Sequence, residues 1–147
     1  MKTLRQLNES KNRPIVSISP EQTVLRALEI MAEHDVGALL VLDGDRLAGV
    51  FSERDYARKV ILIGKASQAT AVKDIMTPFK KLHTVKPETS AEECMVIMTG
   101  KHIRHLPVFD GQALVGIVSI GDVVKAIISE QESLLSQLSD FVVGKYA

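Results

Sequence analysis

The feature that most constrains the fold is an internal duplication. One constant shift, from Pro20 to Pro87, superposes residues 20–55 on residues 87–122 without a gap. Under this shift the same residue recurs in the second copy at the positions of Pro20, Glu21, Met31, Leu39, Val41, Asp43, Gly44, Leu47, Gly49, Ser52 and Asp55. Each copy is too small to bury a sheet face well by itself. We therefore expect two related units that pack face to face as one pseudo-symmetric module.

Apolar periodicity predicts the same order of elements in both copies. In the first copy, a strand over 15–18 precedes a helix capped by Thr23, and strands over 38–42 and 47–51 precede a helix that begins at Ser52. The apolar positions of that last helix include Tyr56, Val60 and Ile61. In the second copy the corresponding elements are a strand over 82–85, a helix over 90–101, strands over 103–109 and 113–118, and a helix from Ser119.

Composition shifts give a provisional division of the chain. Residues 1–13 form an N-terminal arm or helix, and residues 14–70 form the first repeat, which ends in a small, polar linker over 64–70. Residues 71–130 form the second repeat, and 131–147 form a C-terminal helical extension. Apolar positions from Val123 to Leu138 predict one long amphipathic helix, or two, with a face that needs a partner.

Charge and cysteine content exclude several classes of function. Eighteen Lys and Arg balance eighteen Asp and Glu, which argues against a nucleic-acid-binding protein. No stretch approaches the roughly 20 apolar residues of a membrane helix, and the N-terminus lacks the apolar core of a signal peptide. The single cysteine, Cys94, cannot form an internal disulfide, so we expect a cytoplasmic protein.

The duplicated strand-to-helix junction is the candidate site. Residues 49–55 and 116–122 both follow the pattern Gly, apolar, apolar, Ser, two residues, Asp. A helix N-terminus has free amides that attract anions, and a carboxylate can accept both hydroxyls of a ribose. The alternative is a local capping box, in which Ser and Asp satisfy backbone amides. We favour ligand binding because two copies keep this pattern in register, and the two interpretations are partly compatible.

Three features together resemble a tandem cystathionine-β-synthase (CBS) domain pair, or Bateman module. They are the doubled junction, the Ile-Arg-His-Leu-Pro-Val strand at 103–108, and the Asp-Ile-Met-Thr segment at 74–77. The resemblance covers roughly residues 15–130, and small stand-alone bacterial CBS pairs look most similar. It implies an α/β (α+β) fold of two β-α-β-β-α repeats packed through their sheets. It also implies adenosine-containing ligands in two clefts between the repeats and a homodimer shaped as a flat disc.

The resemblance also implies roles for particular residues. Asp55 and Asp122 would bind ribose, Ser52 and Ser119 would contact ribose or phosphate, and the first strand of each repeat would give backbone hydrogen bonds to adenine. Arg104 and His105 would pair with a phosphate, and the alternative is a surface arginine beside a half-buried histidine. The full expected ligand-binding set is Val16, Ser17, Ile18, Gly37, Ala38, Ser52, Arg54, Asp55, His83, Thr84, Val85, Arg104, His105, Ser119, Gly121 and Asp122.

The two expected sites are unequal. Arg104 and His105 replace Gly37 and Ala38 of the first copy, and the Glu53-Arg54 pair becomes Ile120-Gly121 in the second. Arg54 adds positive charge beside Asp55, whereas Gly121 adds space beside Asp122. AMP suits both clefts, and ATP, NAD or NADH are conceivable ligands if one cleft is roomier. Arg58 and Lys59 lie one turn beyond Asp55 and are interpreted as solvated.

No motif for catalysis or metal binding is present. The Gly64-Lys65-Ala66 segment lacks the rest of a phosphate-binding loop, and the histidines have no metal-ligand spacing with Cys94, which we interpret as a small buried apolar group. We therefore expect no catalytic residue, no metal and no catalytic cofactor. The leading hypothesis is an adenine-nucleotide sensor that acts through its dimer on an unidentified effector protein. The alternatives are a structural dimerisation module with vestigial sites and, third, an enzyme acting on a nucleotide.

Overall fold

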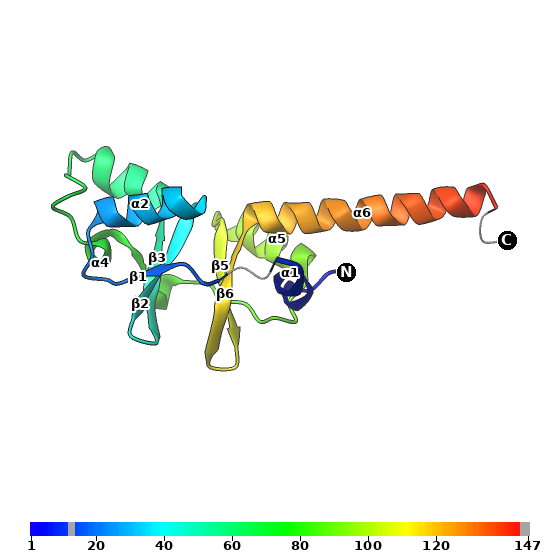
Figure 1. Ribbon diagram of the computed structural model, residues 1–147, viewed down its shortest axis with the longest axis horizontal. Coiled ribbons are helices and arrows are strands. Elements are labelled where there is room, and N and C mark those ends of the chain that lie inside the picture. Colours follow the sequence, from blue (N-terminus) through cyan, green and yellow to red (C-terminus); the bar gives the residue numbers. More distant parts are fainter. Residues whose placement is uncertain (12–13, 145–147) are drawn as a thin grey trace. The chain divides into compact units, whose positions relative to one another are not determined.

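The computed structural model describes residues 1–11 and 14–144, with the side chains of residues 8–11 left out of the description. The chain divides into two compact units (Figure 1). The first unit is Pro14–His83, and the second unit combines Met1–Arg13 with Thr84–Ala147. Each unit contains one copy of the duplicated sequence and has its own apolar core.

The first unit is built on a four-stranded sheet with the order β1-β2-β3-β4. Strand β1 is parallel to β2, and the other neighbours are antiparallel. The elements are β1 (Ser17–Ile18), α2 (Val24–His34), β2 (Ala38–Asp43), β3 (Arg46–Ser52), α3 (Glu53–Tyr56), a π-helical turn η1 (Ala57–Ile61), α4 (Val72–Ile75), β4 (Thr77–Pro78) and a 3-10 turn η2 (Phe79–Lys81). Apolar side chains from α2, the central strands, η1 and α4 form the core.

The second unit repeats this design around the hairpin β5-β6. Its elements are α1 (Leu4–Lys11), α5 (Ala91–Lys101), β5 (His105–Asp110), β6 (Ala113–Ser119) and α6 (Ile120–Val142). In the hairpins, His105 pairs with Ser119 just as Ala38 pairs with Ser52, and each hairpin has a bulge at the equivalent place. The shared register confirms the duplication and the mixed α/β class. The C-terminal segment is a single long helix, one of the two expected alternatives.

Local capping also agrees between the copies. Thr23 accepts a hydrogen bond from the Arg26 amide, as predicted, and Ser90 caps α5 in the same way. Both helices end at a residue with left-handed backbone conformation, Asp35 with φ 52° and His102 with φ 56°. Such a residue lets the chain leave the helix sharply towards the next strand.

Two predictions about elements were wrong. The strand expected over 82–85 is reduced to one bridge, from Val85 to Val108, because a turn closed by the Thr89 amide on the Lys86 carbonyl begins directly afterwards. Ile61 was expected on an apolar helix face but is 56% exposed. The reason is the π-helical turn, closed by the Leu62 amide on the Ala57 carbonyl at 3.2 Å, which changes the rotation per residue.

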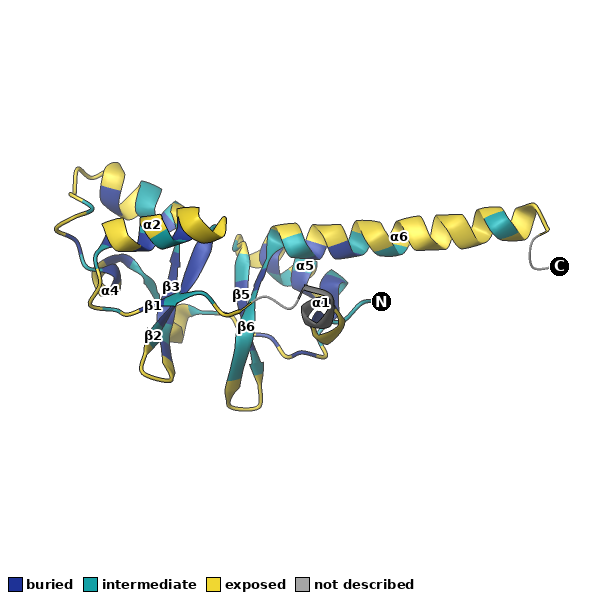
Figure 2. Ribbon diagram, in the orientation of Figure 1, coloured by how far each residue is buried: buried dark blue, intermediate teal, exposed yellow. Residues whose placement is uncertain are grey.

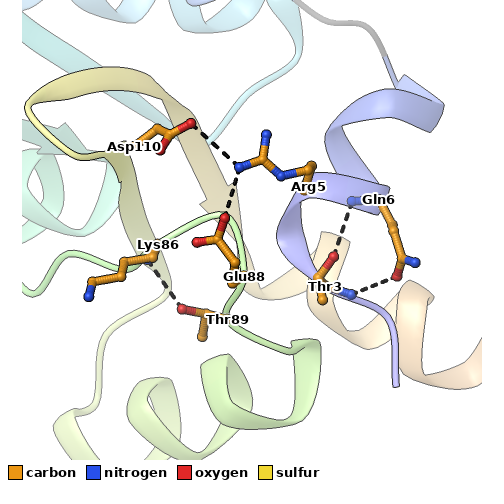
Figure 3. Close-up of polar contacts among 7 residues, drawn as sticks. All are labelled: Thr3, Arg5, Gln6, Lys86, Glu88, Thr89 and Asp110. Carbon is orange, nitrogen blue, oxygen red and sulfur yellow. Dashed lines mark hydrogen bonds and ion pairs between the residues drawn. The ribbon is translucent and has the colours of Figure 1, made fainter.

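The segment that precedes each repeat packs in the unit of the other repeat. In the second unit, Leu4 donates its amide to the Thr89 carbonyl at 3.0 Å, and Ala91 donates to Lys2 at 2.9 Å. The Arg5 guanidinium lies 2.8 Å from Glu88 and 3.5 Å from Asp110 (Figure 3). The N-terminal arm is therefore bound tightly to the second repeat.

The first unit has the same arrangement with α4 in place of α1. Val72 donates its amide to Gln22 at 2.9 Å, Val24 donates to Thr70 at 2.9 Å, and Lys73 forms an ion pair with Glu21 at 3.1 Å. Val72 and Leu4 thus occupy equivalent places. Because residues 64–81 pack in the first unit, the compact unit extends to His83, beyond the boundary expected after Thr70.

We predict that Leu4→Ala destabilises the protein by about 2–5 kcal/mol, the usual cost of truncating a buried leucine. Leu4 is only 3% exposed in the core of the second unit. The free energy of unfolding of the full chain, from urea titration, measures the effect. Leu25→Ala is the control, since Leu25 is 39% exposed and its truncation should cost less than about 1 kcal/mol. Equal costs for both variants would contradict the docking of the N-terminal segment.

Candidate functional site

The first junction is a closed capping box. The Ser52 hydroxyl accepts a hydrogen bond from the Asp55 amide at 3.2 Å, and Asp55 Oδ2 accepts from the Ser52 amide at 3.0 Å and from its hydroxyl at 3.1 Å. Asp55 is 8% exposed, so its carboxylate is one of the few buried charged groups. A buried carboxylate requires partners of this kind. The capping interpretation is therefore correct for this junction.

Lys59 adds a second partner to Asp55. Its ammonium nitrogen lies 3.1 Å from Asp55 Oδ1 and donates to the Ile75 carbonyl at 3.1 Å. The interpretation of Lys59 as merely solvated was wrong, although the side chain remains 45% exposed. The lysine links the junction carboxylate to the C-terminal end of α4.

The second junction has the same cap without the lysine. The Ser119 hydroxyl accepts from the Asp122 amide at 3.2 Å, and Asp122 Oδ2 accepts from the Ser119 amide at 3.4 Å. Asp122 is half-buried, whereas Asp55 is buried. The position equivalent to Lys59 is Ala126, which is 3% exposed and packs in the core. The two junctions therefore share a backbone design and differ in local charge.

Both junctions are anchored to the strand that precedes the hairpin turn. Glu53 donates its amide to the Gly37 carbonyl at 3.1 Å, and Ile120 donates to the Arg104 carbonyl at 2.9 Å. These bonds place the residue before β2 or β5 directly against the start of the junction helix. The predicted pair Gly37 and Ala38 thus lies beside Ser52 in the first unit, and the pair Arg104 and His105 lies beside Ser119 in the second.

The first strands expose backbone groups at a sheet edge. The Leu40 amide donates to the Val16 carbonyl at 3.4 Å, and the parallel register pairs Ser17 with Leu40. In a parallel ladder, alternate residues direct their N–H and C=O groups to opposite sides, so the groups of Ser17 face away from β2. Val85 likewise bonds to β5 through both backbone groups, which leaves those of Thr84 on the outer side.

The remaining predicted residues differ in exposure. Arg104 is exposed and His105 is half-buried, while Arg54 is half-buried and Gly121 is exposed. A side chain added at Gly121 would meet only Ser119 Oγ, at 3.7 Å, so the space beside this junction is open. His83 is exposed and Ile18 is buried. Apart from His83, which ends the first unit, each unit thus brings its own predicted residues to one strand edge and one helix start.

Lys59 is the functional candidate that sequence reasoning missed. The sequence does contain a signal for its ion pair, because Asp55 and Lys59 are four residues apart and such residues lie on the same face of a helix. What the spacing could not show is the contact with Ile75, which is sixteen residues away in sequence. Only the packing of α4 beside the junction provides that partner.

Three further findings concern metal ligands, membrane-spanning helices and Cys94. Across residues 1–11 and 14–144, no group of three or more His, Cys, Asp or Glu could hold a metal ion. Nor does that part of the chain contain a helix of the length and apolarity that crossing a membrane requires. Cys94 is fully buried in α5, and burial, with the nearby Glu93 charge, raises the pKa of its thiol to about 11.

We predict that Cys94 resists alkylation in the folded protein. A raised pKa keeps the thiol protonated at pH 8, and the reactive species is the thiolate. The rate of iodoacetamide modification, followed by mass spectrometry, should rise by orders of magnitude when urea unfolds the chain. A native-state rate equal to that of the unfolded chain would show that the thiol is accessible and ionised.

Comparison with known proteins agrees with this architecture. Residues 7–61 and 72–129 match the CBS domain family. A solved structure of a protein with CBS domains from Burkholderia ambifaria is 47% identical, covers 88% of this chain and 96% of its own, and superposes with a TM-score of 0.83. A mitochondrial CBS domain-containing protein of Arabidopsis thaliana, CBSX3, is 44% identical over 129 residues, which span 86% of this chain but only 63% of the plant protein.

A shorter relative is similar over most of its own length. The CBS domain-containing protein YhcV of Bacillus subtilis is 33% identical over 116 residues, which cover 79% of this chain and 81% of the relative. The matches coincide with both duplicated units and with the hairpins and junctions described above. The chain therefore belongs to the CBS domain family and forms a tandem CBS pair.

Proposed function

We propose that this CBS pair is a regulatory module that binds an adenine nucleotide at each of its two strand-to-helix junctions. The observation that supports this most directly is the repetition of one constellation in both units. Each has a Ser–Asp pair at a helix start and, in the segment that pairs with β2 or β5, a residue whose backbone groups face an open edge, Ser17 or Thr84. A capping box that served only to stabilise the helix start would not require backbone groups that face an open edge at Ser17 and Thr84, so their recurrence favours a ligand.

The chemistry of an adenosine fits these groups. Adenine has neighbouring donor and acceptor atoms that backbone N–H and C=O groups at Ser17 and Thr84 can pair with. The carboxylates of Asp55 and Asp122 can accept the ribose hydroxyls, as acidic residues do in dinucleotide sites. A CBS pair with the same fold, 19% identical and with a TM-score of 0.75, has been described in complex with 5'-methylthioadenosine and S-adenosylmethionine. That protein shows what the fold can hold.

The capping boxes are compatible with ribose binding. A carboxylate has about four lone-pair positions, and the cap of Asp55 uses Oδ2. Oδ1 is engaged by Lys59, so a ribose at this site would share or displace the ammonium group. A phosphate on the same ligand gives the displaced lysine a new partner. At Asp122 the equivalent lysine is replaced by Ala126.

The presence of Lys59 beside Asp55 and of Ala126 at the equivalent place near Asp122 supports two sites that prefer different ligands. Arg54 and Lys59 place two cations near Asp55, which favours a phosphorylated ligand such as AMP, ATP or NAD. Gly121 leaves space beside Asp122 instead. The proposed binding set is otherwise unchanged from the sequence expectation, with Lys59 added. Arg104 and His105 remain candidates for phosphate contacts beside Ser119.

Lys59 also suggests how binding is transmitted. It connects the Asp55 carboxylate to the Ile75 carbonyl at the end of α4, and α4 leads into β4. A nucleotide that draws Lys59 away removes this connection and shifts the population of α4 positions. We propose that a homodimer reports this shift to an effector protein. The cytoplasm remains the predicted compartment, although the plant relative named above is mitochondrial.

The alternative is a structural module whose sites bind nothing. It is favoured by the fact that both Ser–Asp pairs are already engaged in caps. Catalysis has weaker support, because the chain matches only 24% of an inosine-5'-monophosphate dehydrogenase of Methanocaldococcus jannaschii. We propose that the protein is not an enzyme.

We predict that titration calorimetry with AMP detects binding to the wild type, and that Asp55→Ala and Asp122→Ala each remove one site. ADP, ATP, NAD, NADH and S-adenosylmethionine complete the ligand series. Glu29→Ala, at an exposed position of α2, is the control and should bind as the wild type does. No heat of binding for any ligand would support the structural alternative. Binding unaffected by either aspartate variant would refute the residue assignment while leaving a sensor function intact.

We further predict that Lys59→Ala reduces the preference of the first site for AMP over adenosine by roughly tenfold, since a charge-assisted hydrogen bond is lost. The measurement is made in an Asp122→Ala background, so that only the first site is observed. Arg58→Ala is the matched control, because Arg58 is exposed and adjacent. An unchanged AMP-to-adenosine ratio in the lysine variant would exclude Lys59 from ligand recognition.

A further inference from the structure

A mainly apolar stripe with one polar member runs along α6. It consists of Val124, Ile128, Gln131, Leu135, Leu138 and Val142, which alternate at intervals of four and three residues. The apolar members are exposed, from 38% at Val124 and 49% at Ile128 to 66% at Leu135, 61% at Leu138 and 77% at Val142 (Figure 2). We call this set the α6 seam.

The seam differs from the face by which α6 joins its own unit. Val123 and Ala126 lie in the core, and Ile120 and Ile127 pack against it. The seam points elsewhere and continues past the last buried residue of the helix, Ala126, by four turns. Alternating intervals of four and three residues are the spacing of a two-stranded coiled coil, and its polar member, Gln131, is uncharged.

We propose that the α6 seam pairs with the α6 seam of a second copy of this chain, with the two helices antiparallel. Coiled-coil geometry then places Ile128 against the partner's Gln131 and Val124 against the partner's Leu135. Two-fold symmetry repeats each contact with the roles exchanged. The pairing is independent of nucleotide binding and adds a surface to the homodimer of the proposed function.

Charge complementarity selects this orientation and register. Lys125 and Glu132 are exposed, seven residues apart, and therefore occupy the same flank of the seam. In the proposed register each Lys125 lies opposite the partner's Glu132, so that two ion pairs form. Sliding the helices by one heptad in either direction brings together two copies of Lys125 or two copies of Glu132. In a parallel pair, the flank of one helix that carries Lys125 and Glu132 faces the flank of the other helix that carries Ile127 and Leu134. A parallel pair therefore forms neither ion pair.

The other flank is apolar and also complementary. Ile127 lies opposite the partner's Leu134, which is 58% exposed in the single chain. Beyond these residues, Leu138 reaches the partner's Gly121. The space beside Gly121 is open, since an added side chain would meet only Ser119 Oγ at 3.7 Å. The proposed interface therefore ends next to the second junction, in the open space beside Gly121.

The test is a charge-reversal cycle on the full chain, without nucleotide. Sedimentation equilibrium should give a dimer for the wild type, and Lys125→Glu and Glu132→Lys should each weaken the dimer by roughly tenfold, since two attractions become repulsions. The double variant should restore the wild-type dissociation constant. Glu29→Lys is the control for an exposed charge reversal elsewhere and should have no effect.

Cysteine pairs then test the orientation. A mixture of Val124→Cys and Leu135→Cys chains should form a mixed disulfide dimer under mild oxidation, because these residues face each other. Leu135→Cys alone should form none, as its two copies would lie about 16 Å apart along the helices. A monomeric wild type, a dimer insensitive to both single reversals, or a disulfide from Leu135→Cys alone would overturn the proposal. Absence of nucleotide binding would not affect any of these results.

Discussion

The carboxylate at the first strand-to-helix junction holds several parts of its unit together. Asp55 accepts two hydrogen bonds from Ser52, which ends β3, and an ion pair from Lys59, which also bonds to the end of α4. A carboxylate that is only 8% exposed needs hydrogen-bond and ion-pair partners to offset the cost of its burial. Strand, helix and the following segment therefore meet at one group. In the proposed function a ribose binds the same carboxylate, where it would share Oδ1 with Lys59 or displace the ammonium group.

The two copies show how a duplicated design becomes asymmetric. Register, bulges and caps are shared, because they depend on backbone geometry and on a few small or polar residues. Side chains around the junctions differ: Lys59 becomes Ala126, and Gly37 becomes Arg104. The helices differ as well. The first junction helix breaks into a π-helical turn after Tyr56, whereas α6 continues as a regular helix to Val142. In the first copy, Lys59 forms an ion pair with the junction carboxylate of Asp55. In the second copy, the junction helix continues and presents the α6 seam.

The N-terminal segment illustrates a second consequence of duplication. Leu4 and Val72 occupy equivalent places, and each packs in the unit of the repeat that it does not precede. Because Leu4 is buried in the core of the second unit, the beginning of the chain contributes to the stability of residues 84–147. The boundary of a repeat in sequence is consequently different from the boundary of a compact unit in space.

The duplication, the order of the helices and hairpin strands that the two copies share, the cap at Thr23 and the membership in the CBS family could all be predicted from the sequence, and the cap at Ser52 was one of two interpretations. These features depend on periodicity and on residues close together in the chain, which a sequence displays directly. The strand over 82–85, the exposure of Ile61 and the role of Lys59 could not be predicted. They depend on a turn closed by Thr89, on the π-helical turn after Tyr56, and on the approach of Ile75 to the junction. The two turns are local, but the apolar pattern of the sequence does not indicate them. Tertiary packing alone decides the contact of Lys59 with Ile75, because it brings together groups that are sixteen residues apart in sequence.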